Sequence, residues 1–245
     1  MKNSYDQTIG YSPLEHADER KMQQIIAINK EIVDEYYAPG KNALILVAGA
    51  GTGQEAVLVQ REFNQKTVGI DLNIDRKNSP FISQDLLLHV QDLASLAFAG
   101  NQFSLVYSYH VLEHVAHHHA VLKEIYRVLK PGGVLFIGFP NKNRLVSYFG
   151  TSQNASFWTK VKWNLNDYKH RLQGSFENKN GAHAGFTEKE FLGEAAKVFE
   201  KVYSVRNEYM MKKYPRFHGL ISWFITLGVA EIVFPSNYYV CIKEG

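Results

Sequence analysis

Short apolar runs alternate with amphipathic segments over the first 140 residues of the chain. Helical spacing of apolar residues predicts helices, and short apolar runs bounded by turn residues predict buried strands. The predicted helices cover residues 14–37, 53–63 and 118–129, and the predicted strands cover residues 43–48, 66–71, 86–91, 103–109 and 134–139. This alternation indicates an α/β fold with a doubly wound, mostly parallel sheet and helices on both of its faces.

The pattern changes after Pro140. Residues 141–186 show no clear element, and they hold seven Lys or Arg, two acids and eight aromatic residues. The run from Thr187 to Glu190 has the spacing of a capping box, which marks the start of a helix. The elements expected here are a helix over 187–198 and strands over 201–208 and 237–243, with an apolar stretch over 220–234 between the two strands.

Composition limits the kind of protein and its surroundings. A net charge of +3 is too small to indicate a nucleic-acid partner, and the single cysteine, Cys241, is typical of a reducing compartment. The first residues lack the apolar core of a signal peptide, so we expect a cytoplasmic protein. With 45% hydrophobic and 21% charged residues, a chain of 245 residues fits one globular domain.

The apolar stretch 220–234 is shorter than the roughly 20 residues of a membrane span. It also contains Glu231 and is closed by Pro235, so we do not expect a transmembrane segment. For the apolar segment 217–234 as a whole, core packing is the favoured interpretation, and a dimer interface or a membrane-facing surface are the alternatives. No oligomeric state is predicted.

The most informative chemical feature follows the first predicted strand. That strand leads into a glycine turn from Gly49 to Gly53, and the second predicted strand ends in Asp71. Glycines let the backbone turn tightly and approach a ligand, because no Cβ intervenes. A carboxylate at the tip of the second strand is placed to accept hydrogen bonds from two ribose hydroxyls. Together these features predict a nucleoside cofactor.

Further blocks follow in a characteristic order. The blocks are Val47 to Gly53, Gly69 to Leu72, Gln91 to Leu93 with Phe103 to Ser108, and His110 to Val115 with Arg127 to Gly133. In this order and spacing, over about residues 43–140, they resemble the class I S-adenosylmethionine-dependent methyltransferases, in particular the small-molecule group called type 11. The sequence departs from the family at Ala48, where the first glycine of the motif is usual, and in a short or absent helix after Asp71.

The resemblance implies a fold, an activity and a set of site residues. The fold is a Rossmann-like methyltransferase fold whose seven-stranded sheet ends in an antiparallel strand. The activity is transfer of a methyl group from S-adenosylmethionine to a small-molecule acceptor, a metabolite, sugar or lipid-linked intermediate, by O-, N- or C-methylation. The cofactor-binding residues implied are Ala48, Gly49, Ala50, Gly51 and Gly53 beside the methionine part, Asp71 on the ribose, Leu72 on the adenine face, Asp92 and Leu93 on the adenine edge, and Tyr109 near the sulfonium.

We therefore predict a single methyltransferase domain over residues 1–245, with added segments that set the specificity. The N-terminal part is expected to close over the cofactor as a lid. The aromatic and basic residues after Pro140 suit a flat or anionic acceptor, or form an aromatic sub-core with a basic rim. The parts are a helical cap (1–38), a cofactor-binding core (43–140), a substrate-side insert (141–186), and a C-terminal helix and strand pair with an apolar insert (187–245).

Catalysis needs few groups, because the sulfonium supplies the driving force. An oxygen acceptor often requires a base, and a histidine is the natural candidate. His110 is the first candidate, since it follows the fourth predicted strand directly, and His183 is the second, because it precedes the helix that opens at Thr187. Either histidine can also serve only to hydrogen-bond a loop.

Residues 110–114 spell H-x-x-E-H, which is also the pattern of a zinc hydrolase. His110, Glu113 and His114 offer ligands for a divalent ion. We predict no metal, because the motif follows a strand at once and three further histidines crowd it.

Two other classes of protein stay open. The run from Gly51 to Ala56 fits the G-x-G-x-x-A pattern of a nicotinamide dehydrogenase, but that pattern starts two residues late and leaves the block from His110 onward unexplained. A regulatory protein that binds S-adenosylmethionine or its demethylated product without catalysis would keep both Asp71 and Asp92.

Overall fold

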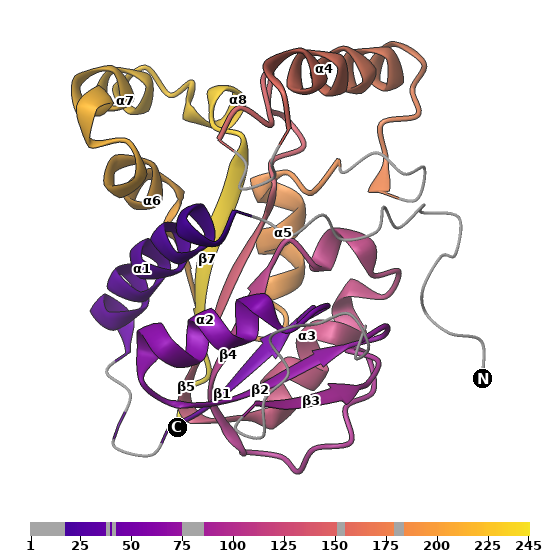
Figure 1. Cartoon of the computed structure of the whole chain (residues 1–245), viewed down its shortest axis with the longest axis vertical. Coiled ribbons are helices and arrows are strands. Elements are labelled where there is room, and N and C mark those ends of the chain that lie inside the picture. The colour runs from indigo at the N-terminus through magenta and orange to yellow at the C-terminus, as the bar shows by residue number, and fades with distance from the viewer. Residues whose placement is uncertain (1–17, 38–39, 41–42, 75–85, 151–154, 179–183) are drawn as a thin grey trace.

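The computed structural model describes residues 18–37, 40, 43–74, 86–150, 155–178 and 184–245 (Figure 1). Over these residues the chain forms a seven-stranded sheet with the strand order β3-β2-β1-β4-β5-β7-β6. The five strands β1 to β5 run parallel to one another, whereas β7 runs antiparallel to its neighbours β5 and β6. The strands are β1 (Leu44–Ala48), β2 (Lys66–Asp71), β3 (Leu87–Val90), β4 (Phe103–Tyr109), β5 (Leu129–Pro140), β6 (Lys201–Ser204) and β7 (Ser236–Ile242). The predicted fold class, with its antiparallel last strand, is confirmed.

The central strand β1 is buried on both of its faces. Ile45 and Val47 belong to one hydrophobic cluster, and Leu46 and Ala48 belong to the cluster on the other side of the sheet. Successive side chains of a strand point to opposite faces, so a strand covered on both sides reads as a continuous apolar run. This is why β1 was visible in the sequence without any alternation.

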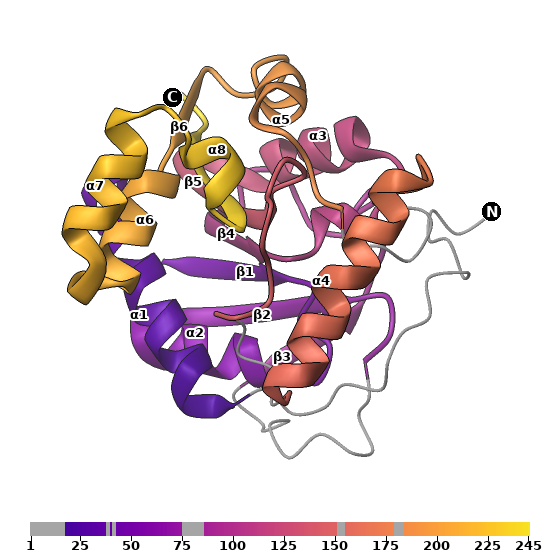
Figure 2. The same cartoon turned by 90° about the horizontal axis from the view of Figure 1, so that it is seen from above.

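Helices cover both faces of the sheet. Core residues of α1, α2 and α6 pack on one face, and core residues of α3 and α5 pack on the other. Helices α4, α7 and α8 stand beyond the end at which β5 finishes and β7 begins (Figures 1 and 2). The helices are α1 (Glu19–Tyr36), α2 (Gln54–Phe63), α3 (His118–Val128), α4 (Phe157–Leu172), α5 (Glu188–Ala195), α6 (Arg206–Lys213), α7 (His218–Thr226) and α8 (Ala230–Val233), with single 3₁₀ turns η1 (Leu112–His114) and η3 (Pro215–Phe217).

Two expectations beyond Pro140 are wrong. The insert contains the helix α4, which its apolar spacing did not indicate because the buried positions of this helix are the polar Asn164 and Asp167. The strand expected over 201–208 ends at Ser204, and the helix α6 begins two residues later. Its residues Tyr209 and Met210 pack into the core, which a helix permits here and an extended strand does not.

The apolar stretch 220–234 is only partly a core element. Ile221, Ala230 and Phe234 are buried in the cluster that covers one face of the sheet. In contrast, Leu220 and Trp223 are 48% and 55% exposed. Core packing therefore accounts for one side of this segment and leaves the other side unexplained.

Helix α1 is not a lid. Ile26, Ile32 and Val33 are fully buried in the core, and the side chain of Asn29 donates a hydrogen bond to the Tyr107 hydroxyl on β4 at 2.7 Å. A segment that opened and closed could not keep these contacts. The expected lid therefore finds no support in residues 18–37, and residues 1–17 lie outside the described part of the chain.

Within the described ranges, no helix combines the length and the apolar character that crossing a bilayer requires.

We expect Ile26→Ala to lower the free energy of unfolding by about 2–5 kcal/mol, because it leaves a cavity in the core beneath α1. The exposed Gln24→Ala on the same helix should change it by less than about 0.5 kcal/mol. Urea denaturation of both variants measures the difference. Equal and small effects would mean that α1 does not belong to the core.

Candidate functional site

A tight glycine turn connects β1 to α2. Gly49 has a φ of 75°, and a Cβ built at this position would lie 2.3 Å from Cγ2 of Val111. The next N–H, of Ala50, donates to the carbonyl of Ile70 at 2.9 Å and so fastens the turn to β2. Only glycine allows both this backbone conformation and the close approach of the segment after β4.

Asp71 joins the tip of β2 to the same turn. One of its carboxylate oxygens accepts from the N–H of Gly51, and the other accepts from the N–H of Asn73, both at 2.9 Å. Burial raises the pKa of Asp71, although these two N–H groups partly offset the effect. Each oxygen keeps a further lone pair, so the carboxylate can still accept from a ligand.

The segment after β4 closes this end of the sheet. His110 adopts the left-handed conformation, with a φ of 57°, and its N–H donates to the carbonyl of Gly138 at 2.8 Å. A histidine held in this sparsely populated region is strained, and such strain gathers at functional sites. Residues 112–114 continue as the 3₁₀ turn η1 rather than as an α-helix.

Glu113 is the buried partner of His110. Its side chain is 1% exposed, and one carboxylate oxygen lies 3.2 Å from Nδ1 of His110. Burial alone would raise the pKa of Glu113, but the hydrogen bond and charge of His110, together with His114, outweigh it and hold the pKa below its ordinary value. A carboxylate at Nδ1 orients the ring and leaves Nε2 for another partner.

The H-x-x-E-H pattern does not form a metal centre over the described residues. His110, Glu113 and His114 lie on a 3₁₀ turn and the residues beside it, so the two histidines do not share a helical face. No group of three or more His, Cys, Asp or Glu side chains among the described residues is arranged to hold a metal ion.

The adenine-side candidates lie next to Asp71 along the sheet. The N–H of Gln91 donates to the Asp71 carbonyl at 3.0 Å, which brings the end of β3 beside the end of β2. Asp92 follows directly, and its carboxylate accepts from the N–H of Ala94 at 2.9 Å. The side chain of Leu93 is buried in the core, whereas Leu72 is 36% exposed. The roles of these residues toward a ligand stay predictions.

Tyr109 points into a stack of tyrosines. Its ring lies 6.2 Å from Tyr238, which stacks on Tyr209 at 3.7 Å, and it meets the ring of His110 edge-on at 4.5 Å. Next to Tyr209 stands Lys213, whose amino group lies 5.3 Å from the centre of the Tyr209 ring. Burial lowers the pKa of Lys213 to about 8.

The sequence did not indicate this tyrosine stack or Lys213, because they come from β7 and α6, far along the chain. Glu113 was visible within the H-x-x-E-H pattern, but its pairing with His110 was not. Glu55, in the first turn of α2, also went unnoticed, and burial raises its pKa to about 8.

The structure brings together the turn from Ala48 to Gly53, Asp71, and the segment from Tyr109 to Glu113 at the carboxyl end of the sheet. Asp92 and Leu93 follow β3 at the same end. His183 lies outside the described residues.

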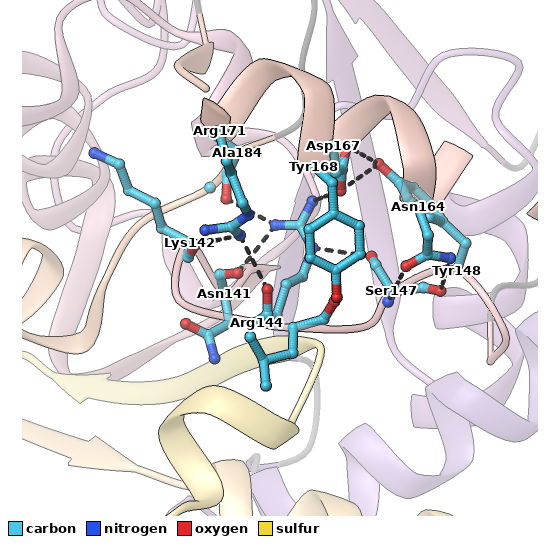
Figure 3. A network of polar contacts seen from close by, with 12 residues as sticks. Asn141, Lys142, Arg144, Ser147, Tyr148, Asn164, Asp167, Tyr168, Arg171 and Ala184 are labelled. Carbon is cyan, nitrogen blue, oxygen red and sulfur yellow. Dashed lines mark hydrogen bonds and ion pairs between the residues drawn. The ribbon is translucent and has the colours of Figure 1, made fainter. Parts of the chain in front are cut away.

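The insert is fastened over this end of the sheet by a buried ion pair (Figure 3). Arg144 is 2% exposed, and its guanidinium donates to the Asp167 carboxylate on α4 at 2.8 Å. The same guanidinium donates to the carbonyls of Asn141 and Ala184 at 3.0 and 2.8 Å. Because each partner of a buried charge is satisfied, the network fixes how α4 sits.

Comparison with known proteins agrees with this geometry. Residues 46–137 match a family model described as a methyltransferase domain. A ubiquinone/menaquinone biosynthesis C-methyltransferase from Desulfotalea psychrophila is 35% identical over 99 residues, which are 39% of this chain and 40% of that protein. The chain thus aligns with less than half of the length of this curated relative.

Two solved structures show the same fold. Phosphoethanolamine N-methyltransferase 2 from Haemonchus contortus has a TM-score of 0.57 at 18% identity, covering 89% of this chain and 52% of that chain. Geranyl diphosphate C-methyltransferase from Streptomyces coelicolor, solved with Mg²⁺, geranyl diphosphate and S-adenosylhomocysteine, has a TM-score of 0.51 at 17% identity, covering 99% and 89%.

The fold is therefore the Rossmann-like fold of the methyltransferases. Residues 46–137 match the model of the type 11 methyltransferase domain family.

We expect Gly49→Ala to destabilise the protein more than Gly132→Ala. Both glycines have a φ of 75°, but a Cβ at Gly132 meets nothing within 4 Å. The control, Gly132→Ala, should lower the free energy of unfolding by about 1–2 kcal/mol, because of its backbone conformation alone. Gly49→Ala should lower it by about 1–3 kcal/mol more, because its Cβ collides with Val111. Equal unfolding free energies in urea would show that the contact with Val111 is not tight.

Proposed function

We propose that the chain binds S-adenosylmethionine at the carboxyl end of the sheet and transfers its methyl group to a small-molecule acceptor. The observation that carries this proposal is the Asp71 carboxylate, bonded to the glycine turn at 2.9 Å within the segment matched by the family model. A carboxylate beside a tight glycine turn fits a ligand with a ribose and a chain that approaches the backbone closely.

Each part of the cofactor has residues suited to it. Asp71 would accept from the ribose hydroxyls with its remaining lone pairs, and Leu72 and Asp92 would hold the two sides of the adenine. The methionine part would lie along the turn from Ala48 to Gly53. Glu55, in the first turn of α2, is a carboxylate near this turn that an ammonium group could pair with.

When bound, the cofactor supplies an electrophilic methyl group on a sulfonium. What the chain adds is alignment, exclusion of water and a site for a proton. Glu113 would hold Nδ1 of His110, so that Nε2 takes the proton that an oxygen or nitrogen acceptor loses. In this arrangement His110 is the catalytic residue and Glu113 is a positioning residue.

The acceptor would lie beside His110 and the ring of Tyr109. Tyr109 offers a flat apolar surface, and the buried rings of Tyr238 and Tyr209, with Lys213 beside Tyr209, support it from within the core. Such surroundings suit a small acceptor with an apolar or aromatic body. Whether the methyl group goes to oxygen, nitrogen or carbon depends on that acceptor.

We expect Asp71→Asn to weaken binding of S-adenosylhomocysteine by roughly 10- to 150-fold, measured by calorimetry. Loss of hydrogen bonds to a charged acceptor costs about 1.5–3 kcal/mol, which corresponds to this range. Asn keeps one acceptor oxygen for the Gly51 N–H and loses the bond from Asn73, and circular dichroism checks that the fold persists. The exposed Asp34→Asn is the control and should bind as the parent does. If the parent protein binds NADH and not S-adenosylhomocysteine, the proposed function fails.

We expect His110→Ala to lower turnover by ~10²-fold or more with unchanged S-adenosylhomocysteine affinity, because the base is lost. Glu113→Gln should lower kcat less, again without weakening the cofactor. Transfer of labelled methyl groups into a cell extract measures both. His119→Ala, whose ring pairs with Glu194 away from the site, is the matched control. Cofactor binding without any labelled product from the parent would favour the regulatory alternative.

A further inference from the structure

Helix α4 turns its polar side toward the protein. Asn164 and Asp167 are its buried residues, at 9% and 8% exposure, and both bond to the loop that follows β5. The Asn164 side chain accepts from the N–H of Ser147 at 2.7 Å and donates to the carbonyl of Ser147 at 2.9 Å. The Asp167 carboxylate accepts from the Arg144 guanidinium (Figure 3). One turn on, Arg171 donates to the carbonyls of Lys142 and Arg144.

The opposite side of α4 is apolar and faces outward. Trp158, Leu165 and Leu172 are 76%, 63% and 90% exposed. With Lys162 and Lys169, which are also exposed, they recur at alternating steps of four and three residues, so all five lie on one stripe of the helix. An ordinary surface helix buries its apolar stripe and exposes its polar one. Here the arrangement is inverted, and the Arg144–Asp167 ion pair prevents the helix from turning over.

A second apolar surface stands at the same end of the molecule. It consists of Leu220 and Trp223 on α7 and of Leu227, which directly follows this helix. Their side chains are 48%, 55% and 53% exposed, and their spacing also places them on one stripe. Figures 1 and 2 show α4 and α7 beyond the carboxyl ends of the parallel strands, with α8 between them. We call these eight residues the docking face: Trp158, Lys162, Leu165, Lys169, Leu172, Leu220, Trp223 and Leu227.

Basic residues outnumber acids along α4 and from α6 to α7, and Glu231 on α8, which lies between α4 and α7, is bonded to Asn143. From Phe149 to Leu172 the sole acid in the sequence is Asp167, which is already paired with Arg144. Between Glu208 and Glu231 the sequence has no acid, and it has Lys212, Lys213, Arg216 and His218, of which Lys212 pairs with Glu31, Glu35 and Glu208. Tryptophans and leucines interleaved with lysines suit a bilayer interface, where the apolar side chains enter and the ammonium groups reach the lipid phosphates.

We propose that the docking face binds the surface of an anionic phospholipid bilayer. The basic charge and the tryptophans favour this occupant over an apolar protein surface, which would not require lysines within the apolar stripe. Binding at this face would hold the carboxyl end of the sheet against the membrane, where an acceptor of low water solubility is found. The proposal does not depend on methyl transfer, and its test measures binding alone.

Co-sedimentation of the full chain with lipid vesicles tests the proposal. We expect binding to vesicles that contain phosphatidylglycerol, weaker binding to pure phosphatidylcholine, and loss of binding at high salt. Lys162→Glu with Lys169→Glu should weaken binding by roughly 30-fold or more, because each basic residue contributes about a fivefold gain at an anionic surface. Trp158→Gln with Trp223→Gln should weaken it as well.

The matched control is Lys66→Glu with Lys123→Glu, which makes the same change in net charge at two exposed lysines outside the docking face. It should sediment as the parent protein does. Equal loss in the control, equal binding to neutral vesicles, or no binding by the parent would overturn the proposal. So would a dimer in sedimentation velocity that the tryptophan variant dissociates, since a second copy would then cover this face.

Tryptophan fluorescence gives a second readout. The chain has three tryptophans, and all of them lie on α4 or α7. Single-tryptophan variants that keep Trp158 or Trp223 should shift to the blue on vesicles and be quenched by brominated lipid. The variant that keeps Trp163, which packs on Tyr148 at 5.3 Å, should respond less. Equal quenching of all three would contradict the assigned face.

Discussion

The hydrogen bond from the Gly51 N–H to the Asp71 carboxylate is the interaction on which the site depends. It joins two loops that lie 20 residues apart in the sequence, and it aims the carboxylate at the turn from which a bound ligand would be held. Burial raises the pKa of Asp71, and the backbone N–H groups that bond to its carboxylate oppose this shift. The strained His110 segment packs against the same turn through Val111. The three loops therefore form one unit.

A second constraint acts outside the sheet. The Arg144–Asp167 ion pair and the amide contacts of Asn164 hold α4 by its polar side. Replacing one partner of such a pair would leave a buried charge without compensation, which makes the arrangement costly to rearrange. The result is a helix whose exposed stripe is apolar. Neither the cofactor site nor the sheet requires this arrangement, and the proposed contact of the stripe with a bilayer accounts for it.

The tyrosine stack connects the two regions. Tyr109 leaves the end of β4 beside His110, and Tyr238 and Tyr209 continue the row toward α6, which precedes α7. An acceptor that arrived at the end carrying α4 and α7 would meet Tyr109 beside His110, while Tyr238 and Tyr209 support this ring from within the core. Among the described residues, this layout relates the apolar outer helices to the proposed chemistry without a lid, since α1 is packed into the core.

The sequence alone determined the α/β sheet, the positions of β1, β2 and β4, and the cofactor motif. Each of these features depends on residues that are adjacent in the chain, a short apolar run or a glycine turn. It also determined that Asp71 follows β2 directly. It did not reveal α4, because the buried residues of this helix are polar, or α6, because this helix begins within a run of residues that resembles a strand. The pairing of Glu113 with His110, the tyrosine stack and the inverted face of α4 were decided by tertiary structure. They rest on side-chain orientation and on contacts between distant segments, which spacing along the chain does not record.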